Sequence, residues 1–116
     1  MKLTIKRISG TPLDADLIGH IERRAEFSLG RVGLHVQQVR IGLEDLNGPR
    51  GGLDKCCQVQ VMLAGEAPLV VSETSADEYA AVNRALSVAS HLAERRIARR
   101  REHARGTRIQ MPAIVG

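Results

Sequence analysis

A strand passes directly into a long helix in residues 69–105, and this stretch decides the fold: LVVSETSADEYAAVNRALSVASHLAERRIARRREHAR. The turn residues Gly65-Glu66-Ala67-Pro68 come directly before it, and residues 69–74 are predicted to form a strand. Ser75 and Glu78 have the spacing of a capping box, so a helix is expected to begin there. It is predicted to run to about residue 104, with Gly106 as the residue that ends it.

The predicted helix changes character along its length. Its first four turns carry an apolar stripe that is expected to face the sheet, with Tyr79 as a core anchor: Tyr79, Val82, Leu86, Ala89 and Ala93. Past Ala98 the stripe stops, and Arg100 falls at the angle that Val82 and Ala93 occupy. Because a helix that is polar on all sides has nothing to bury, the last two turns are predicted to project beyond the edge of the sheet.

Positive charge is concentrated at this end of the helix. Residues 95–108 contain seven arginines and one glutamate, a net charge of +6, whereas the whole chain carries +4. Cations gathered on one element are typical of a surface that binds a partner with many phosphates. The alternative is a plain solvated helix end. The gain of about 0.3–1 kcal/mol per cation near a helix C-terminus, however, needs only two or three arginines.

Shorter elements precede this stretch. Alternation predicts strands over about 2–8, 36–44 and 55–63, and helical spacing predicts a helix over about 12–28 with Thr11 as its N-cap. The order β-α-β-β-β-α predicts an α+β fold, a two-layer sandwich in which two helices cover one face of a four-stranded sheet. The length suits one domain, which we place at 1–105, followed by a flexible C-terminal tail over 106–116.

Composition narrows the ways in which the chain can bind a partner. Phe27 and Tyr79 are its only residues of the Phe/Tyr/Trp set, so it lacks the row of rings on which RNA-recognition motifs and OB-folds stack bases. A nucleic acid would therefore be bound through backbone and shape more than through bases. No apolar run approaches the ~20 residues of a membrane span, and the alternating N-terminus is unlike a signal peptide. We expect a cytoplasmic protein with no membrane partner.

No pattern of reactive residues points to catalysis. Cys56 and Cys57 are adjacent, which in a strand turns them to opposite faces and excludes half of a CxxC metal site. Both are expected to be reduced, with Cys57 inside and Cys56 outside. The four histidines show no metal-ligand spacing, and no Ser-His-Asp or Cys-His arrangement is recognisable. We therefore predict no enzyme activity, no metal, no cofactor and no small-molecule substrate.

Residues 77–83, DEYAAVN, resemble a motif of the ribosome hibernation-promoting factor family. That family includes the ribosome-associated translation inhibitor and proteins once called sigma-54 modulators. Its members are similar in opening a long basic second helix with an Asp-x-Tyr-x-Ala-Ile/Val-Asp/Asn run after a fourth strand. The Thr-Pro opening of the first helix and the Gly-Asn-rich hairpin turn also match. The resemblance covers residues 1 to about 105 and implies a fold like that of the double-stranded RNA-binding domain.

The family resemblance also implies a function. Members sit in the decoding region of the small ribosomal subunit, where basic residues of both helices contact rRNA and the folded domain blocks the path of tRNA and mRNA. By resemblance, this chain is a stress and hibernation factor that inhibits translation. The implied partners are the small ribosomal subunit and its rRNA, and we expect a monomer off the ribosome.

Site residues follow from the resemblance and from the charge pattern. Arg24 matches a basic position late in the first helix, and Arg95 and Arg99 match basic positions late in the second. Three residues stand where relatives carry basic ones: Phe27, Val88 and His91. Further arginines along the helix would compensate for them. The predicted rRNA-binding set is Arg23, Arg24, Arg95, Arg96, Arg99, Arg100, Arg101 and Arg105, with Arg50 and Lys55 of a flexible hairpin tip as an auxiliary contact.

Two other interpretations remain open. A general double-stranded RNA-binding domain of related topology usually places lysines where this helix begins with Asp77 and Glu78. A protein-interaction module would use the basic helix to meet an acidic protein. Competition with a plain RNA duplex separates the first interpretation from ribosome binding, and survival of the complex after nuclease treatment identifies the second.

Overall fold

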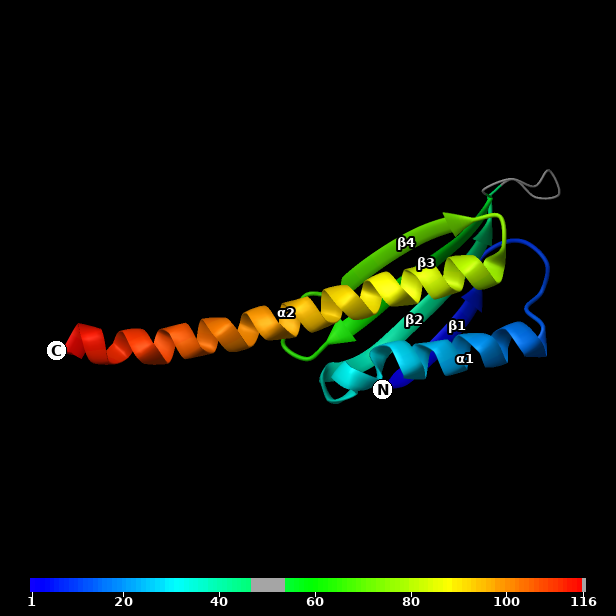
Figure 1. Ribbon diagram of the computed structural model, residues 1–116. Coiled ribbons are helices and arrows are strands. Elements are labelled where there is room, and N and C mark those ends of the chain that lie inside the picture. Colours follow the sequence, from blue (N-terminus) through cyan, green and yellow to red (C-terminus); the bar gives the residue numbers. More distant parts are fainter. Residues whose placement is uncertain (47–53, 116) are drawn as a thin grey trace.

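The computed structural model describes residues 1–46 and 54–115, with side chains up to residue 102. Its elements follow the predicted order, and both helices cover the same face of one sheet (Figure 1). The bounds are β1 (Lys2–Arg7), α1 (Ala15–Leu29), a 3-10 helix η1 (Gly30–His35), β2 (Val36–Asp45), β3 (Lys55–Leu63), β4 (Leu69–Ser75) and α2 (Glu78–Val115). The prediction of a two-layer α+β sandwich is confirmed.

The sheet has the strand order β1-β2-β3-β4. β1 pairs with β2 in parallel, and α1 makes the crossover between them, while β2, β3 and β4 pair antiparallel. Leu3 lies opposite Val39, Val39 opposite Val61, and Val61 opposite Leu69. Because these residues share one face of the pleat, they form a continuous apolar row against which the helices pack.

Each helix turns a narrow stripe of side chains toward this row. α1 buries four residues that follow one another at a spacing of four: Leu17, Ile21, Ala25 and Leu29. α2 buries alanines at the same spacing, together with larger side chains beside them: Ala81, Ala85, Ala89 and Ala93, with Val82, Leu86 and Ile97. The small side chains let the backbone of α2 lie close to the sheet.

α1 begins later than predicted. Its N-cap is Asp14 and not Thr11, because the Asp14 carboxylate accepts a hydrogen bond of 2.7 Å from the backbone N–H of Leu17. A charged acceptor suits the positive end of a helix better than a neutral hydroxyl does. The chain before Asp14 therefore stays non-helical. At its other end α1 stops at Leu29, within a residue of the prediction, and continues as η1.

β2 contains an irregularity that disturbs the simple alternation of its sequence. A β-bulge lies between Val36 and Gln38. The extra residue moves the alternation by one position, so that Val36 and Val39 are both buried. The strand thus starts at Val36. The buried residues on the two sides of the bulge are Val36 and Val39.

The two cysteines are both buried, so the prediction that Cys56 lies outside was wrong. Cys56 points away from the core yet is only 6% exposed, since its Sγ lies 3.2 Å from the hydroxyl of Ser72 on the neighbouring strand. Both thiols are free. Cys57 lies in the core, where burial raises the pKa of its thiol to about 12.

α2 is longer than predicted. It does not end at Gly106 but continues to Val115. A glycine costs a helix interior about 1 kcal/mol and removes no backbone hydrogen bond, so it does not end a helix by itself. Ile97 is the last buried residue of α2 among those with described side chains, and beyond it the helix projects away from the sheet (Figure 1). The projection is confirmed, while the division into 1–105 and 106–116 stays a prediction.

Candidate nucleic-acid interface

Three arginines near the end of the described side chains of α2 have no partner among the residues whose side chains are described. Arg95, Arg99 and Arg101 are exposed. None of them lies within 4 Å of a carboxylate in the part of the chain whose side chains are described. Since a guanidinium stays charged at any physiological pH, each adds a full positive charge to this surface. The predicted uncompensated charge is therefore present on this part of α2.

Arg96 and Arg100 are partly used by the fold. Arg96 Nη1 donates to the backbone carbonyl of Ala67 at 2.6 Å, and Arg100 Nη1 donates to that of Ala64 at 2.8 Å. The Arg100 guanidinium lies over Gly65, which has a φ of +74°, so closely that a Cβ there would come within 3.0 Å of Nη2. The two arginines clamp the turn between β3 and β4 to α2. A carbonyl carries no net charge, and neither arginine forms an ion pair with a carboxylate of the described residues, so both guanidinium charges stay uncompensated there.

The two predicted arginines of α1 differ in burial. Arg23 is exposed and folds back over Gly19, where a Cβ would lie 3.1 Å from its Nη1. Arg24 is half-buried, and its guanidinium carbon lies 5.6 Å from the centre of the Phe27 ring. The Arg24 Nε is buried and has no hydrogen-bond partner among the described residues. α1 packs against α2 (Figure 1), and Arg24 lines a hollow between them together with Ser87, Ser90 and Glu94 of α2.

Arg31, which was not among the predicted residues, lies on this surface as well. It is exposed in η1 and lines one hollow with Arg24 and Glu94 and another with Arg101 and Glu94. Arg31 therefore joins the arginines of α1 to those of α2. One sequence feature could have indicated it: Arg31 directly follows Gly30, the C-cap of α1. A cation is favoured there by the negative end of the helix.

Lys55, one of the two predicted auxiliary residues, does not join this surface. Lys55 begins β3, whereas the turn that the arginines clamp follows Leu63 at the other end of the same strand. Its Nζ lies 2.7 Å from Asp45 Oδ2 and 3.6 Å from Asp54 Oδ2, and the hydrogen bond to Asp45 raises the pKa of Lys55. Two carboxylates thus balance its charge. Arg50 and the side chain of Arg105 lie outside the described residues.

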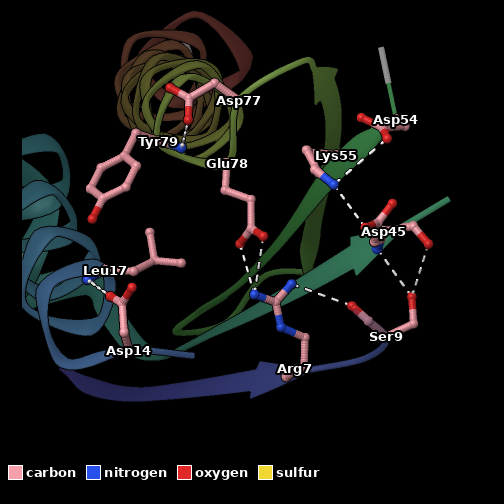
Figure 2. A network of polar contacts seen from close by, with 10 residues as sticks. All are labelled: Arg7, Ser9, Asp14, Leu17, Asp45, Asp54, Lys55, Asp77, Glu78 and Tyr79. Atoms are coloured by element: carbon pink, nitrogen blue, oxygen red, sulfur yellow. Dashed lines mark hydrogen bonds and ion pairs between the residues drawn. The ribbon is translucent and has the colours of Figure 1, made fainter. Parts of the chain in front are cut away.

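The DEYAAVN motif holds the start of α2 in place. Asp77 caps the helix, since its carboxylate accepts from the backbone N–H groups two and three residues later at 3.4 and 3.3 Å. Glu78 binds Arg7 of β1, whose Nη2 donates to the two carboxylate oxygens at 2.9 and 3.1 Å (Figure 2). The first turn of α2 is therefore attached to the far edge strand of the sheet.

Tyr79 and Asn83, also in this motif, attach α2 to α1. Tyr79 is not the predicted core anchor: it is 37% exposed and packs its ring against that of His20, with 4.9 Å between the ring centres. His20 Nε2 also makes a hydrogen bond of 2.7 Å with Asn83 Oδ1. Val82 takes the core position instead, because the stripe that is fully buried runs through it. The motif thus serves the fold and contributes nothing to the arginine surface.

No metal centre is present in the described part of the chain, where no three His, Cys, Asp or Glu side chains lie close enough together to hold an ion. The helices described also include none with the length and apolar character needed to cross a membrane. What the geometry offers is a positively charged surface over α2, η1 and the end of α1. Its chemistry is that of charge-assisted hydrogen bonding to anionic oxygen atoms.

No protein-family model matches the chain, and no curated protein matches its sequence. Among solved structures, the fold is similar to a ribosomal subunit interface protein from Coxiella burnetii, with a TM-score of 0.71 and 15% identity over 84% of this chain and 99% of that one. It is also similar to the N-terminal domain of Protein Y from Thermus thermophilus, with a TM-score of 0.67 and 20% identity over 82% of this chain and 98% of that one. The resemblance found in the sequence is thereby confirmed at the level of the fold.

Proposed function

We propose that this chain is a ribosome-associated hibernation factor that binds small-subunit rRNA at the decoding region. It inhibits translation there by occluding the path of tRNA and mRNA, and it is a cytoplasmic monomer off the ribosome. The observation that carries the proposal is the array of exposed arginines on α2 that have no carboxylate partner in the described part of the chain. The support from the fold is its similarity to that of a ribosomal subunit interface protein.

The proposed mechanism is occlusion, with no chemical step. Guanidinium groups present planar, forked donors that match phosphate oxygens, so they hold the domain on the rRNA backbone without reading its sequence. Outside residues 95–108 the chain is net negative, which favours an approach with the arginine end of α2 leading. If five arginines each neutralise one phosphate, log K should fall with log[salt] at a slope of roughly −3.5 to −4.5.

Sucrose-gradient sedimentation with ribosomes at low salt tests the proposal. The native chain is expected to migrate with small subunits or whole ribosomes. A variant with Arg95→Ala, Arg99→Ala and Arg101→Ala is expected to stay at the top of the gradient, because three phosphate contacts are lost. The matched control removes the same three charges from the uncovered face of the sheet, with Lys2→Ala, Lys6→Ala and Arg40→Ala. The control is expected to migrate as the native chain does.

The choice of arginines follows from the structure. Arg96 and Arg100 are left in place because they hold the β3–β4 turn, so that replacing them would mix a loss of stability with a loss of binding. Unchanged thermal unfolding of the triple variant, together with lost migration, assigns these side chains to binding. Equal migration of the native chain and the triple variant contradicts the proposal.

The competing interpretations predict different results in the same gradient. A general double-stranded RNA binder would be displaced from ribosomes by an excess of plain RNA duplex. That interpretation gains no support from the start of α2, where Asp77 caps the helix and Glu78 binds Arg7. A protein-interaction module would yield a complex that survives nuclease treatment. Either outcome contradicts recognition of rRNA at the decoding region.

A further inference from the structure

A small hollow lies between the end of α1 and the middle of α2. Its volume is about 280 Å³. One side is formed by Arg24, Phe27 and Arg31, and the other by Ser87, Ser90 and Glu94. The hydroxyl of Ser90 donates to the backbone carbonyl of Ser28, which fixes the distance between the two walls. The hollow is smaller than the pockets that enclose drug-sized ligands, so its occupant is a small group.

Phe27 presents its ring to solvent beside this hollow. The residue is 79% exposed, although it lies on a helix with a well-formed buried stripe. A single exposed apolar residue is common on protein surfaces and is no site by itself. Here, however, the Arg24 guanidinium lies over the ring, 5.6 Å from its centre, while most of the side chain remains exposed to solvent. This arrangement leaves room for a second flat group against the exposed ring.

Glu94 is the second unusual feature, since it places a carboxylate among arginines. It is the only acidic residue among the described residues that line the hollow. Neither Glu94 nor Arg31 forms an ion pair in the described structure, although both line the same two hollows. A carboxylate repels phosphate, so Glu94 opposes a phosphate bound in this hollow. A carboxylate does accept hydrogen bonds from the amino groups of nucleobases.

We propose that this hollow binds one unstacked nucleobase of the bound RNA. The base stacks on the exposed ring of Phe27, its exocyclic amino group donates to Glu94, and Arg24 and Arg31 hold the neighbouring phosphates. The proposal rests on the proposed function and deepens it, because it adds a choice of base to a surface that otherwise reads backbone and shape. Bases that carry an amino group are preferred over uracil, which has none.

Direct binding of short RNAs to the full chain tests the choice of base. The probes are fluorescein-labelled hexanucleotides of cytidine and of uridine, followed by anisotropy at one fixed salt concentration. The native chain is expected to bind the cytidine probe roughly 5- to 100-fold more tightly, the range for one hydrogen-bonded base contact. Phe27→Leu is expected to weaken both probes by roughly 5-fold or more, the loss of one aromatic stack.

Glu94→Gln separates base recognition from charge. Glutamine offers a donor as well as an acceptor, so the cytidine-to-uridine ratio is expected to fall close to one. Loss of a negative charge also tightens binding of the uridine probe. A purely electrostatic role of Glu94 would tighten both probes equally and leave the ratio unchanged. The matched controls are Glu22→Gln on the exposed side of α1 and Leu34→Ala, which is 102% exposed in η1 and does not line the hollow.

A fluorescent reporter adds a second measurement. The chain contains no tryptophan, so Phe27→Trp introduces a single one beside the hollow. Its emission can be excited apart from that of Tyr79, and the indole keeps the ability to stack. Its emission is expected to be quenched by the cytidine probe more strongly than by the uridine probe. A native chain that binds both probes equally, or a Phe27→Leu variant that binds as the native chain does, overturns the nucleobase site.

Sedimentation with ribosomes keeps the two proposals distinguishable. Normal migration of the native chain without any preference between the probes overturns the nucleobase site and leaves the proposed function standing. A second outcome is that the native chain fails to migrate with ribosomes but prefers the cytidine probe, and that Glu94→Gln loses this preference. That outcome overturns the proposed function and supports the nucleobase site. Failure of both measurements overturns both proposals.

Discussion

Between Glu78 and Ile97, α2 lies on the sheet and buries seven side chains, whereas the five described side chains from Ala98 to Glu102 are all exposed. In the first part, the polar residues also bind other elements of the fold, as Glu78 does with Arg7. In the second part, the exposed arginines have no carboxylate partner among the described residues. The first part therefore mainly holds the domain together. The second part, together with Arg95 near the end of the first, presents charge to a partner, although Arg100 also holds the β3–β4 turn.

The difference shows what each kind of sequence evidence is worth. The motif on which the family resemblance rests lies in the first part, where Asp77 caps α2 and Asn83 binds His20. It is therefore evidence about the fold, and the two solved structures agree with it at that level. Evidence about binding comes from the second part, where an exposed guanidinium on the helix is enough to contact a phosphate. The two parts need separate experiments.

Truncation of Leu86 is expected to have the largest effect on the packed part. Its side chain is fully buried between α2 and the sheet, so Leu86→Ala removes apolar contacts and leaves a cavity. The expected loss in the free energy of unfolding is about 2–5 kcal/mol, measured by urea denaturation. Val88→Ala is the matched control, because Val88 is on the same helix and 38% exposed. The control is expected to change stability by less than about 0.5 kcal/mol. A loss below about 1 kcal/mol for Leu86→Ala would contradict close packing.

Cys57 reports how dry the core beneath the packed part is. Burial raises the pKa of its thiol from 9.0 to about 12, so at pH 8 the reactive thiolate is about a thousand-fold rarer in the folded chain than in the unfolded one. Alkylation by iodoacetamide, located by peptide mapping, is expected to be slow at Cys57 and to become fast in urea. Rapid alkylation of Cys57 in the folded chain would contradict a dry core.

The same pKa sets the direction of the alkaline effect. The unfolded chain releases the Cys57 proton near pH 9, while the folded chain keeps it until about pH 12. Stability is therefore unaffected by Cys57 below pH 9 and falls as the pH rises from 9 toward 12, because the folded state binds the extra proton. A Cys57→Ala variant is expected to lose this part of the alkaline decline, which urea denaturation at pH 8 and pH 10.5 can measure.

Removal of the Glu78 carboxylate is expected to have a smaller effect, at the point where the packed part of α2 is attached to β1. Arg7 and Glu78 are largely buried, with side-chain exposures of 15% and 18%, and the Arg7 Nε has no partner in the described structure. Glu78→Gln leaves a buried guanidinium without its counter-charge. The expected cost is about 1–3 kcal/mol, measured by urea denaturation. The exposed Glu22→Gln is the control, and equal effects of the two substitutions would mean that the ion pair contributes nothing.

Much of the fold was predictable because burial imposes a period on the sequence. β3 was predicted over the residues that it occupies, 55–63, since its alternation is unbroken. The predictions of detail failed where two residues suited the same position, or where burial of a side chain depended on a neighbouring strand. Thr11 and Asp14 both suit an N-cap, and the charged residue takes the position. Cys56 alternates outward as predicted, but Ser72 covers it.

The site was predictable only as a location. The run of arginines placed the positive surface on α2, and the end of the stripe placed its exposed part. Which arginines are occupied depends on how far the β3–β4 turn reaches along the helix, and no spacing in the sequence gives that distance. Arg100 was expected at the angle of the core stripe, and this is why it meets the turn. Arg31 was missed because it joins the surface only once η1 packs beside α2.

The smallest expected effect is a difference in stability between two pairs of arginines on α2. Arg96→Ala with Arg100→Ala removes two hydrogen bonds to exposed turn carbonyls, and it is expected to lower stability by about 1 kcal/mol in total. Arg95→Ala with Arg99→Ala removes the same charge from side chains that make no such bond in the described structure. This second pair is expected to change stability by less than about 0.5 kcal/mol.

The two double variants are informative because each is expected to change a different measurement. If the arginines that hold the turn are distinct from those that bind, the Arg96 and Arg100 variant loses more stability than the Arg95 and Arg99 variant. The Arg95 and Arg99 variant in turn loses more of its migration with ribosomes. Urea denaturation and sedimentation on the same four proteins (native, each pair, and all four substitutions) measure both effects. The four side chains are neighbours on the same two turns of α2, so any departure of the quadruple variant from the sum of the two stability changes measures the coupling between the pairs. Equal stability losses for the two pairs would mean that the turn contacts do not orient α2, and that its arginines form one interchangeable surface.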